Sequence, residues 1–299
     1  MTRLPVSVGR IRLKNPTLLA SGILGSTGAS LARAAEWGAG GVVTKSLGVE
    51  PRTGYKGPTV VRLETGAINA VGLSNPGWRG FLPELSDARR GGVPVMASLF
   101  GAFPAEFGAM ARGLRRHVDG FELNLSCPHV KNVGSEVGSD PRLVRAIVRA
   151  AKEGARKPVW AKLTPHADVT EVGRAAERAG ADALVAVNTL RAAAFDVETG
   201  RSLLGNRVGG LSGPPLKPVA LRCVYELYEE VSIPIVGSGG VSNWRDAVEF
   251  LSAGARAVEI GTALLDGTGV FRDVTAGLRK FLARNRTNLG GLVGRSHRA

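Results

Sequence analysis

Cysteine, aromatic residues and long apolar runs are all scarce in this sequence. Its 299 residues include only two cysteines, Cys127 and Cys223, which argues against a disulfide scaffold and against an iron–sulfur cluster held by this chain alone. Aromatic residues make up 5% of the chain, whereas 41 glycines indicate many tight turns between closely packed elements. No apolar run reaches the length of a membrane helix, and the first residues are charged and interrupted by proline. These absences predict a soluble, cytoplasmic protein with no membrane association.

Acidic residues are outnumbered by basic ones, 25 to 39, so the formal net charge is +14. Such an excess can signal binding to nucleic acid, to an anionic membrane or to an acidic protein, or a general bias that collects small anionic substrates. The basic residues are scattered over predicted helices, apart from a tail after Lys280, and no stacking aromatic residues are interleaved with them. We therefore expect no nucleic-acid partner, while the purpose of the charge stays open.

Short apolar strands alternate with helical segments along the whole chain. Eight strands are predicted, at residues 17–21, 41–46, 93–98, 119–126, 158–162, 183–188, 234–237 and 257–261. Strands that alternate with helices pair in parallel, and eight such units in 299 residues fit an α/β fold of the closed (β/α)8 TIM-barrel type better than an open doubly wound sheet. No GxGxxG follows the first strand, which weakens the case for a dinucleotide-binding fold.

Further features are expected around the barrel. Residues 6–13 predict a small N-terminal hairpin around Gly9, and residues 47–80 and 191–213 are long insertions after a strand, the first of them without a strong helix. Insertions of that length in a compact domain are usually functional. No shift in composition marks a domain boundary, so residues 1–299 are predicted to form one barrel domain with a disordered basic tail from about residue 285.

Polar residues and glycines stand at the carboxyl ends of the predicted strands, where barrels of this kind carry their active sites. They are Ser21, Lys45, Ser46, Ser98, Asn124, Cys127, Lys162, Asn188, Thr189, Gly239, Gly240, Gly261 and Thr262. A purely structural barrel needs no lysines there, because a buried ammonium group is costly without a partner. Taken alone, Cys127 fits a small buried hydrophobe as well as a reactive thiol. Its place among polar strand ends favours the thiol.

The last two strands are followed by a pattern typical of a phosphate site. The segments are IVGSGGVSN (235–243) and VEIGTALL (258–265). Glycines let backbone N–H groups approach an anion, and the N-terminus of the following helix adds a favourable partial charge. Each glycine pair alone indicates only a turn, but in the loops after strands seven and eight they together predict a bound phosphate. An extended phosphorylated cofactor would also account for the other polar strand ends.

Eight short motifs follow one another along the chain. They are TKS (44–46), NAVGLSNPG (69–77), NLSCPHV (124–130), AKLTP (161–165), VNTL (187–190), GGLSGP (209–214), GSGGV (237–241) and IGT (260–262). No single motif is decisive, but all eight in order resemble class 1 dihydroorotate dehydrogenases, and most of all their cysteine-using, NAD-linked branch. The resemblance implies a barrel with one FMN per chain that oxidises dihydroorotate to orotate in pyrimidine biosynthesis.

The resemblance also implies roles for single residues, with no metal ion among the ligands. Cys127 would remove a proton from carbon 5 while hydride passes from carbon 6 to the flavin, and Lys162 would stabilise negative charge on the reduced flavin. The implied substrate-binding residues are Lys45, Asn69, Val71, Gly72, Leu73, Asn124, His129, Asn188 and Thr189. The implied flavin-binding residues are Ser21, Lys45, Ser46, Ser98, Asn124, Lys162, Val187, Gly213, Gly239, Gly240, Gly261 and Thr262.

Two of these positions depart from the family pattern. His129 stands where an asparagine is usual, two residues after the cysteine, so the pH profile of the reaction stays open. Ser98 stands where an asparagine often contacts the flavin. Outside the motifs, Cys223 lies in a helical pattern and is predicted to be a core residue.

The electron acceptor after FMN is not decided by the sequence. In the NAD-linked branch a separate subunit carries FAD and a [2Fe–2S] cluster and passes electrons to NAD+; fumarate and a quinone are the alternatives. We also expect a homodimeric core. The alternative function is another FMN barrel that acts on a pyrimidine, similar to dihydropyrimidine dehydrogenase or to tRNA dihydrouridine synthase, although the latter should carry an RNA-binding domain after the barrel. A non-catalytic phosphate- or RNA-binding barrel would leave Lys45, Cys127 and Lys162 without a purpose.

Overall fold

Eight parallel strands close into a barrel, which confirms the predicted (β/α)8 fold. The structure is a computed structural model that describes residues 4–126 and 137–299. The order of the strands around the barrel is their order in the chain, and β14 pairs with β3 to close it. They are β3 (Thr17–Leu19), β4 (Gly41–Val43), β7 (Val95–Leu99), β8 (Gly120–Asn124), β9 (Val159–Lys162), β10 (Ala183–Ala186), β13 (Ile235–Ser238) and β14 (Ala255–Ile260).

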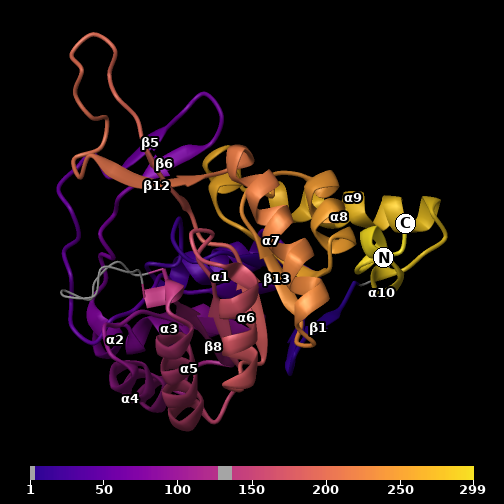
Figure 1. Ribbon diagram of the computed structural model, residues 1–299, viewed down its shortest axis with the longest axis horizontal. Coiled ribbons are helices and arrows are strands. Elements are labelled where there is room, and N and C mark those ends of the chain that lie inside the picture. Colours follow the sequence, from indigo (N-terminus) through magenta and orange to yellow (C-terminus); the bar gives the residue numbers. More distant parts are fainter. Residues whose placement is uncertain (1–3, 127–136) are drawn as a thin grey trace.

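Helices cover the outside of the barrel (Figure 1). They are α1 (Gly28–Glu36), α3 (Leu82–Ala88), α4 (Pro104–Leu114), α5 (Pro141–Ala155), α6 (Val169–Arg178), α7 (Lys217–Glu230), α8 (Trp244–Ser252) and α9 (Val270–Arg284). The start of α5 is capped, because the Asp140 side chain accepts a hydrogen bond from the backbone of Arg142 at 2.8 Å and Pro141 follows. Small residues let these helices pack closely, since a Cβ on Gly154 of α5 would lie 2.2 Å from the Gly108 carbonyl oxygen of α4.

The interior of the barrel has two layers of opposite character. The lower layer is apolar and fully buried, and it includes Leu18, Val43, Met96, Trp160 and Val236. The predicted hairpin, made of β1 (Val6–Val8) and β2 (Ile11–Leu13), packs on this layer and covers the N-terminal end of the barrel. Towards the carboxyl ends the buried side chains are polar or charged: Ser98, Glu122, Lys162, Ser238 and Glu259. The open, polar end of the barrel therefore carries the site.

The two long insertions pair with each other in a second sheet, which the sequence did not predict. This small sheet has the order β11-β12-β6-β5 and lies beyond the carboxyl end of the barrel (Figure 1). Its strands are β5 (Val60–Arg62) and β6 (Ala67–Asn69) from the first insertion, and β11 (Leu190–Ala193) and β12 (Val208–Ser212) from the second. The first insertion also ends in a short helix, α2 (Gly77–Gly80), followed directly by α3. Neither helix was expected there.

The C-terminal segment is ordered, so the expectation of a disordered tail is wrong. After α9 the chain forms α10 (Leu289–Leu292) and a last helical turn over Arg295–His297. The His297 ring stacks on Tyr225, with 3.9 Å between ring centroids, and its Nε2 lies 3.0 Å from the carbonyl oxygen of Ala253. An aromatic stack and a hydrogen bond to the main chain outweigh what the basic composition suggests about order.

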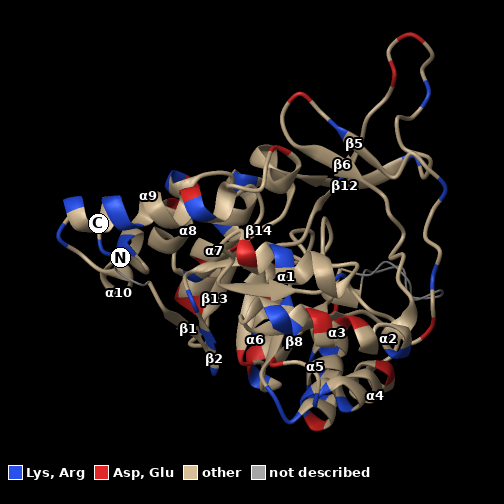
Figure 2. Cartoon of the chain, turned by 180° about the vertical axis from the view of Figure 1, so that it is seen from behind, with Lys and Arg blue, Asp and Glu red and all other residues tan. Residues whose placement is uncertain are grey.

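Charged residues are distributed over the surface and do not form one stripe. Figure 2 shows Lys and Arg on several of the outer helices, with Asp and Glu among them. Many of the exposed ones pair locally, such as Arg174 with Glu230 at 2.6 Å. Among the described helices, none combines the length and the apolar character that a membrane span requires.

Candidate active site

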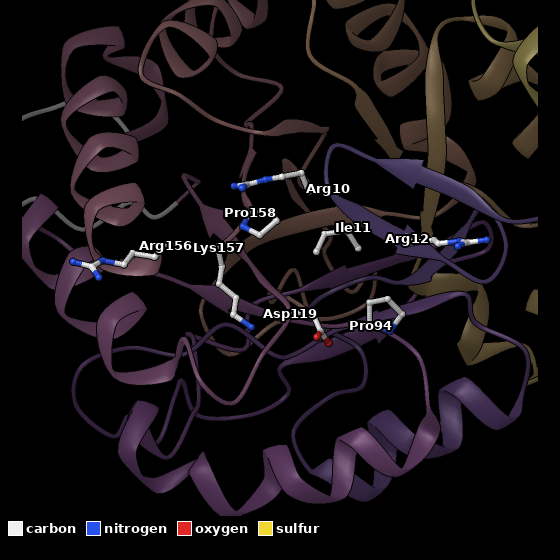
Figure 3. Close-up of a pocket in the computed structure, with 8 residues that line it drawn as sticks. All are labelled: Arg10, Ile11, Arg12, Pro94, Asp119, Arg156, Lys157 and Pro158. Atoms are coloured by element: carbon white, nitrogen blue, oxygen red, sulfur yellow. The ribbon is translucent and has the colours of Figure 1, made fainter.

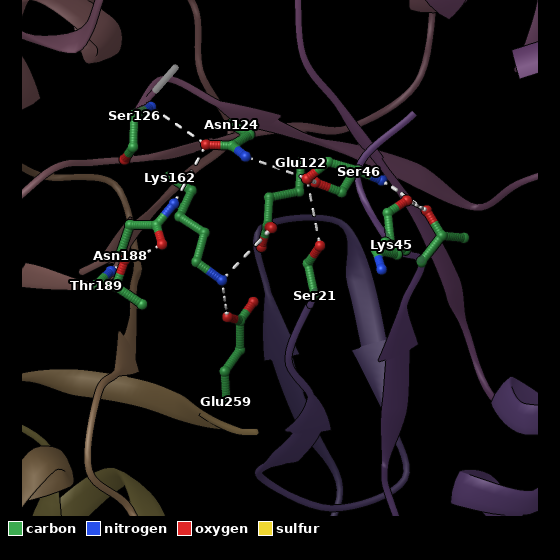
Figure 4. Close-up of polar contacts among 12 residues, drawn as sticks. Ser21, Lys45, Ser46, Glu122, Asn124, Ser126, Lys162, Asn188, Thr189 and Glu259 are labelled. Atoms are coloured by element: carbon green, nitrogen blue, oxygen red, sulfur yellow. Dashed lines mark hydrogen bonds and ion pairs between the residues drawn. The ribbon is translucent and has the colours of Figure 1, made fainter. Parts of the chain in front are cut away.

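A connected group of polar side chains lies at the carboxyl ends of the barrel strands (Figure 4). The Ser46 hydroxyl is at its centre, 2.9 Å from the Ser98 hydroxyl and 3.4 Å from that of Ser21. The Asn124 amide donates to Ser46 at 3.1 Å, and the Asn188 amide donates to Asn124 at 3.2 Å. Five strand ends are thus joined by hydrogen bonds, as the sequence predicted from their polar residues.

Backbone alternation explains why these side chains point into the barrel. In β8 the residues Phe121 and Leu123 face the helices, so Glu122 and Asn124 face inwards. After β4 the Thr44 hydroxyl accepts a hydrogen bond from the backbone of Ser98 at 3.0 Å. That bond ties the end of β4 to β7 and holds the two residues after Thr44 at the mouth of the barrel.

Lys45 is half-buried at this mouth, and no acidic side chain in the described residues pairs with it. Burial lowers the pKa of Lys45 from its usual 10.5. It lines a cavity of about 430 Å³ together with residues of the first insertion, among them Arg52, Ser74 and Asn75. A cation beside such a cavity is suited to hold an anionic group of a ligand.

Lys162 lies deeper and sits between two buried carboxyl groups. Its Nζ is 2.5 Å from Glu259 and 3.6 Å from Glu122. Burial alone would lower the pKa of Lys162, but attraction to Glu122 and Glu259 raises it above 10.5, so the group is charged. Burial, and then the neighbouring Glu259, raise the pKa of Glu122 well above its usual value. Lys162 was predicted as a site residue from the sequence, but Glu122 and Glu259 were not. The alternation of side chains in β8 could have indicated Glu122, because it places this residue on the same face as Asn124.

The predicted substrate segment connects β6 to the rest of the site. The Asn69 amide donates to the Gly210 carbonyl oxygen at 3.1 Å. Thr189 lies against the same glycine, because a Cβ on Gly210 would come within 2.2 Å of the Thr189 hydroxyl. Asn69 and Thr189, from the two insertions, therefore meet at one glycine.

The next residues turn sharply. Gly72 and Leu73 both have positive φ, 74° and 58°, and Val71 accepts a hydrogen bond from the backbone of Tyr55 at 3.1 Å. The buried side chain of Asn75 fixes this turn, because it donates to the Leu73 carbonyl oxygen at 2.8 Å and accepts from the backbone of Gly77 at 2.8 Å. Asn75 belongs to the motif NAVGLSNPG (69–77), but its role in fixing the turn was not predicted.

Glycines make room for backbone approach at the other side of the mouth. Gly213, Gly239 and Gly240 have φ of 90°, 122° and 83°, and a Cβ on Gly240 would lie 2.8 Å from the Gly213 carbonyl oxygen. The Thr262 methyl would be 3.3 Å from a Cβ on Gly213. In this glycine-lined cradle backbone segments lie closer together than a side chain would permit, and the phosphate site predicted for it stays a prediction.

Side chains cap the N-terminus of α8. The Asn243 side chain accepts from the backbone of Arg245, and the Asp246 side chain accepts from those of Ser242 and Asn243. The contribution of this helix end to a phosphate site stays a prediction. Gly261 and Val187 were also predicted to bind the flavin. The φ of Gly261 is −126°, outside the left-handed region, and the backbone N–H of Val187 donates to the Ser238 carbonyl oxygen at 2.7 Å.

Cys127 and His129 lie outside the described residues. The chain is described up to Ser126, whose backbone N–H donates to the Asn124 side chain at 3.2 Å. The other cysteine, Cys223, is fully buried in α7, which confirms it as a core residue, and burial raises the pKa of its thiol. In the described part of the chain, no cluster of His, Cys, Asp and Glu could hold a metal ion.

A second cavity, of about 360 Å³, lies at the opposite end of the barrel (Figure 3). It is lined by residues that precede β7, β8 and β9, and by Arg10, Arg12, Arg156 and Lys157. These cations do not converge: Figure 3 shows Arg12 and Arg156 at opposite sides, and Lys157 donates to the Val118 carbonyl oxygen at 2.8 Å. The polar mouth is therefore the candidate active site.

Comparison with known proteins identifies the family. A family model described as dihydroorotate dehydrogenase matches residues 3–282. A relative from Methanocella arvoryzae is 54% identical over 297 residues, which cover 99% of this chain and 98% of the relative. One from Methanosarcina acetivorans is 51% identical and covers 96% and 94%, and one from Pyrococcus furiosus is 53% identical and covers 91% of each. All three are named dihydroorotate dehydrogenase B (NAD(+)), catalytic subunit. This chain belongs to the dihydroorotate dehydrogenase family.

Proposed function

We propose that this chain is a catalytic subunit that oxidises dihydroorotate to orotate with FMN as its bound flavin. The observation that carries the proposal is the convergence of Lys45, Lys162 and the hydrogen-bonded amides and hydroxyls at one end of the barrel. The relatives named dihydroorotate dehydrogenase B support the same reaction over nearly the whole chain. The chain would act as one FMN-binding domain.

The residues at the mouth fit one FMN. Bound FMN supplies a two-electron acceptor that takes a hydride from carbon 6 of the substrate. The glycine-lined cradle would hold the phosphate through backbone N–H groups, and the buried Lys162 cation would favour the negatively charged, reduced state. The remaining flavin contacts would come from Ser21, Lys45, Ser46, Ser98, Asn124, Val187, Gly261 and Thr262.

The substrate would lie between the barrel mouth and the first insertion. Asn124, Asn188 and Thr189 present amide and hydroxyl groups that suit the polar edges of a pyrimidine ring, and Lys45 suits its carboxylate. Asn69 and the turn at Val71, Gly72 and Leu73 would close over the ring from the small sheet. Cys127 would take the proton from carbon 5, a role that rests on the family motif. His129 would hydrogen-bond the substrate in place of the usual asparagine.

A second subunit would receive the electrons. The relatives are named catalytic subunits of an NAD(+) enzyme, which implies a partner for electron transfer. We propose that this partner carries FAD and a [2Fe–2S] cluster and reduces NAD+, because the two cysteines of this chain are too few for a cluster. We also propose a homodimeric core, for which the exposed Phe195 and Val197 of the small sheet's long loop offer apolar surface.

The visible spectrum of the purified, FMN-loaded chain tests the function. Dihydroorotate added without oxygen should bleach the flavin bands of the unmutated protein and of Cys223→Ala, but not those of Cys127→Ala at neutral pH. Bands that persist in the unmutated protein would contradict the substrate. A colourless chain that cannot be reconstituted with FMN would contradict the cofactor.

A further inference from the structure

Three charged side chains from three different strands meet inside the barrel below the mouth. Lys162 comes from β9, Glu122 from β8 and Glu259 from β14, and they are exposed by only 5%, 0% and 1% (Figure 4). The Lys162 ammonium touches Glu259 at 2.5 Å, whereas Glu122 is 3.6 Å away. No other charged group in the described residues forms an ion pair with any of the three.

The charges of this group do not balance if both acids are ionised. One ammonium group would then face two carboxylates, and a net negative charge would be buried among strands. Both carboxyl oxygens of Glu122 and one of Glu259 accept no hydrogen bond from the described residues. A buried carboxylate without donors is strongly disfavoured, and two acids that share a site avoid double ionisation by keeping one proton between them.

The distances decide which acid keeps the proton. Glu259 makes the short contact with Lys162 and is the natural ionised partner. Glu122 is farther from the cation and close to Glu259, to which its protonated form can donate a hydrogen bond. The upward displacement of the Glu122 pKa, caused first by burial and then by Glu259, agrees with this assignment.

We propose that Glu122 is an un-ionised carboxylic acid in the folded protein, and that the Glu122–Glu259 pair is a positioning device that sets the charge Lys162 presents to the flavin. With one proton on the pair, Lys162 and its two acids are neutral overall, and the ammonium group is held in place from two sides. This role rests on the proposed function, since it takes Lys162 as the residue that faces FMN.

Flavin reduction potentials follow from this charge balance. Reduction adds negative charge, so a more positive surrounding raises the potential. In Glu259→Gln alone, Glu122 can ionise beside Lys162 and restore the charge balance. The double variant Glu122→Gln/Glu259→Gln leaves Lys162 without an ionised partner and should raise the potential. Glu122→Gln replaces a neutral acid with a neutral amide of the same shape and should leave the potential near that of the unmutated protein at neutral pH. Lys162→Met should lower it.

Infrared difference spectroscopy tests the proton directly and does not need the flavin. Subtracting the spectrum of Glu122→Gln from that of the unmutated chain at neutral pH should reveal a band of a protonated carboxylic acid. The matched control Glu226→Gln, on an exposed face of α7, should instead reveal the bands of an ionised carboxylate. If Glu122→Gln does not fold, isotope labelling of glutamate in the unmutated chain should shift a protonated-acid band at neutral pH, and the absence of any such band would overturn the inference.

The outcomes separate this inference from the proposed function. Loss of an ionised carboxylate band in Glu122→Gln would overturn the inference, and so would a potential of the double variant Glu122→Gln/Glu259→Gln equal to that of the unmutated protein. A chain that binds no FMN would disprove the proposed function and the effect on the potential together. The acid band would in that case still report whether Glu122 keeps its proton.

Discussion

Lys45 and Lys162 place two ammonium groups at the same end of the barrel in opposite surroundings. Lys162 is fully enclosed and held between two acids, which raise its pKa, so its charge is permanent. Lys45 is half-buried without an acidic partner in the described residues, and burial lowers its pKa. The permanently charged Lys162 suits a cofactor that stays bound, whereas Lys45, beside a cavity, suits a substrate that binds and is released.

The pH dependence of the reaction should report the charge on Lys45. Because the pKa of Lys45 is below 10.5, its ammonium group is charged below that lowered pKa and neutral above it. If the charge holds the substrate carboxylate, kcat/KM should fall as the pH rises through the lowered pKa. Lys45→Met should lower kcat/KM by about 10²–10³-fold at pH values below the lowered pKa, and the difference should shrink above it, where Lys45 itself is neutral.

The matched variant is Lys45→Arg, whose guanidinium stays charged at all accessible pH values. In Lys45→Arg the fall of kcat/KM at alkaline pH should disappear or move to higher pH, even if kcat/KM is lower at every pH. An alkaline fall at the same pH in the unmutated protein and in Lys45→Arg would show that another group is responsible. Rates measured from pH 6 to pH 10.5 would cover the usual pKa of 10.5 and the lowered one.

The sequence predicted individual residues of the site better than it predicted which side chains contact them. Ser46, Asn124 and Lys162 could be selected because a polar residue at the end of an apolar strand is unusual. The acids Glu122 and Glu259 are 137 residues apart in the chain and meet only because their strands lie in a closed barrel. Contacts across a barrel interior depend on strand register, which the sequence of one strand does not contain.

The small sheet is the element that completes the mouth of the barrel. It was not predicted, because its strands are three to five residues long and lie in insertions rich in glycine and polar residues. The pairing also joins segments about 140 residues apart, such as Asn69 with Gly210. The eight barrel strands were predictable, since each is an apolar run bounded by turn residues and repeats a local pattern.

Gly210→Ala tests whether the small sheet positions Thr189 for the substrate. The new Cβ would lie 2.2 Å from the Thr189 hydroxyl, so the threonine or the strand must shift. A shift of about 1 Å in a positioning group can cost on the order of 100-fold in rate. We expect kcat/KM for dihydroorotate to fall by about 10–100-fold, while FMN stays bound.

Gly57→Ala, in the first insertion, is the control, because its Cβ would meet nothing nearer than the backbone nitrogen of Thr59 at 4.0 Å. Steady-state kinetics and the flavin content of both variants give the comparison. If kcat/KM is the same for Gly210→Ala and the unmutated protein, the position of Thr189 does not matter for the reaction.

On the scale of the whole molecule, the C-terminal segment joins the ends of two outer helices. The His297 ring stacks on Tyr225 and lies tilted against Tyr228, with ring centroids at 3.9 and 4.6 Å, and it contacts Ala253 after α8. His297→Ala removes a stack and a hydrogen bond, so the free energy of unfolding should fall by about 1–3 kcal/mol. Urea unfolding measures this change, and His117→Ala, at an exposed histidine, should change it little. An equal free energy of unfolding for His297→Ala and the unmutated protein would mean that the C-terminal segment packs on the two helices without stabilising them.

The proposed homodimer is also a property of the whole molecule. Phe195 and Val197 are 61% and 92% exposed on the loop of the small sheet, an exposure unusual for side chains of this kind. Phe195→Asp combined with Val197→Asp should convert a dimer into monomers, as measured by light scattering after size-exclusion chromatography. Phe103→Asp, at an equally exposed aromatic residue near α4, should leave the dimer intact. A double variant that stays dimeric would place the contact elsewhere.

The N-terminal hairpin packs on the apolar layer around Trp160 and covers the N-terminal end of the barrel, so ligands have to enter at the carboxyl end. Dihydroorotate and orotate would then pass the same rim, to which Lys45 and the first insertion contribute. A partner subunit that covered the rim completely would trap the product. Electrons need no opening, because they can cross a thin protein wall, so an electron-transfer partner is free to bind where it leaves this rim uncovered.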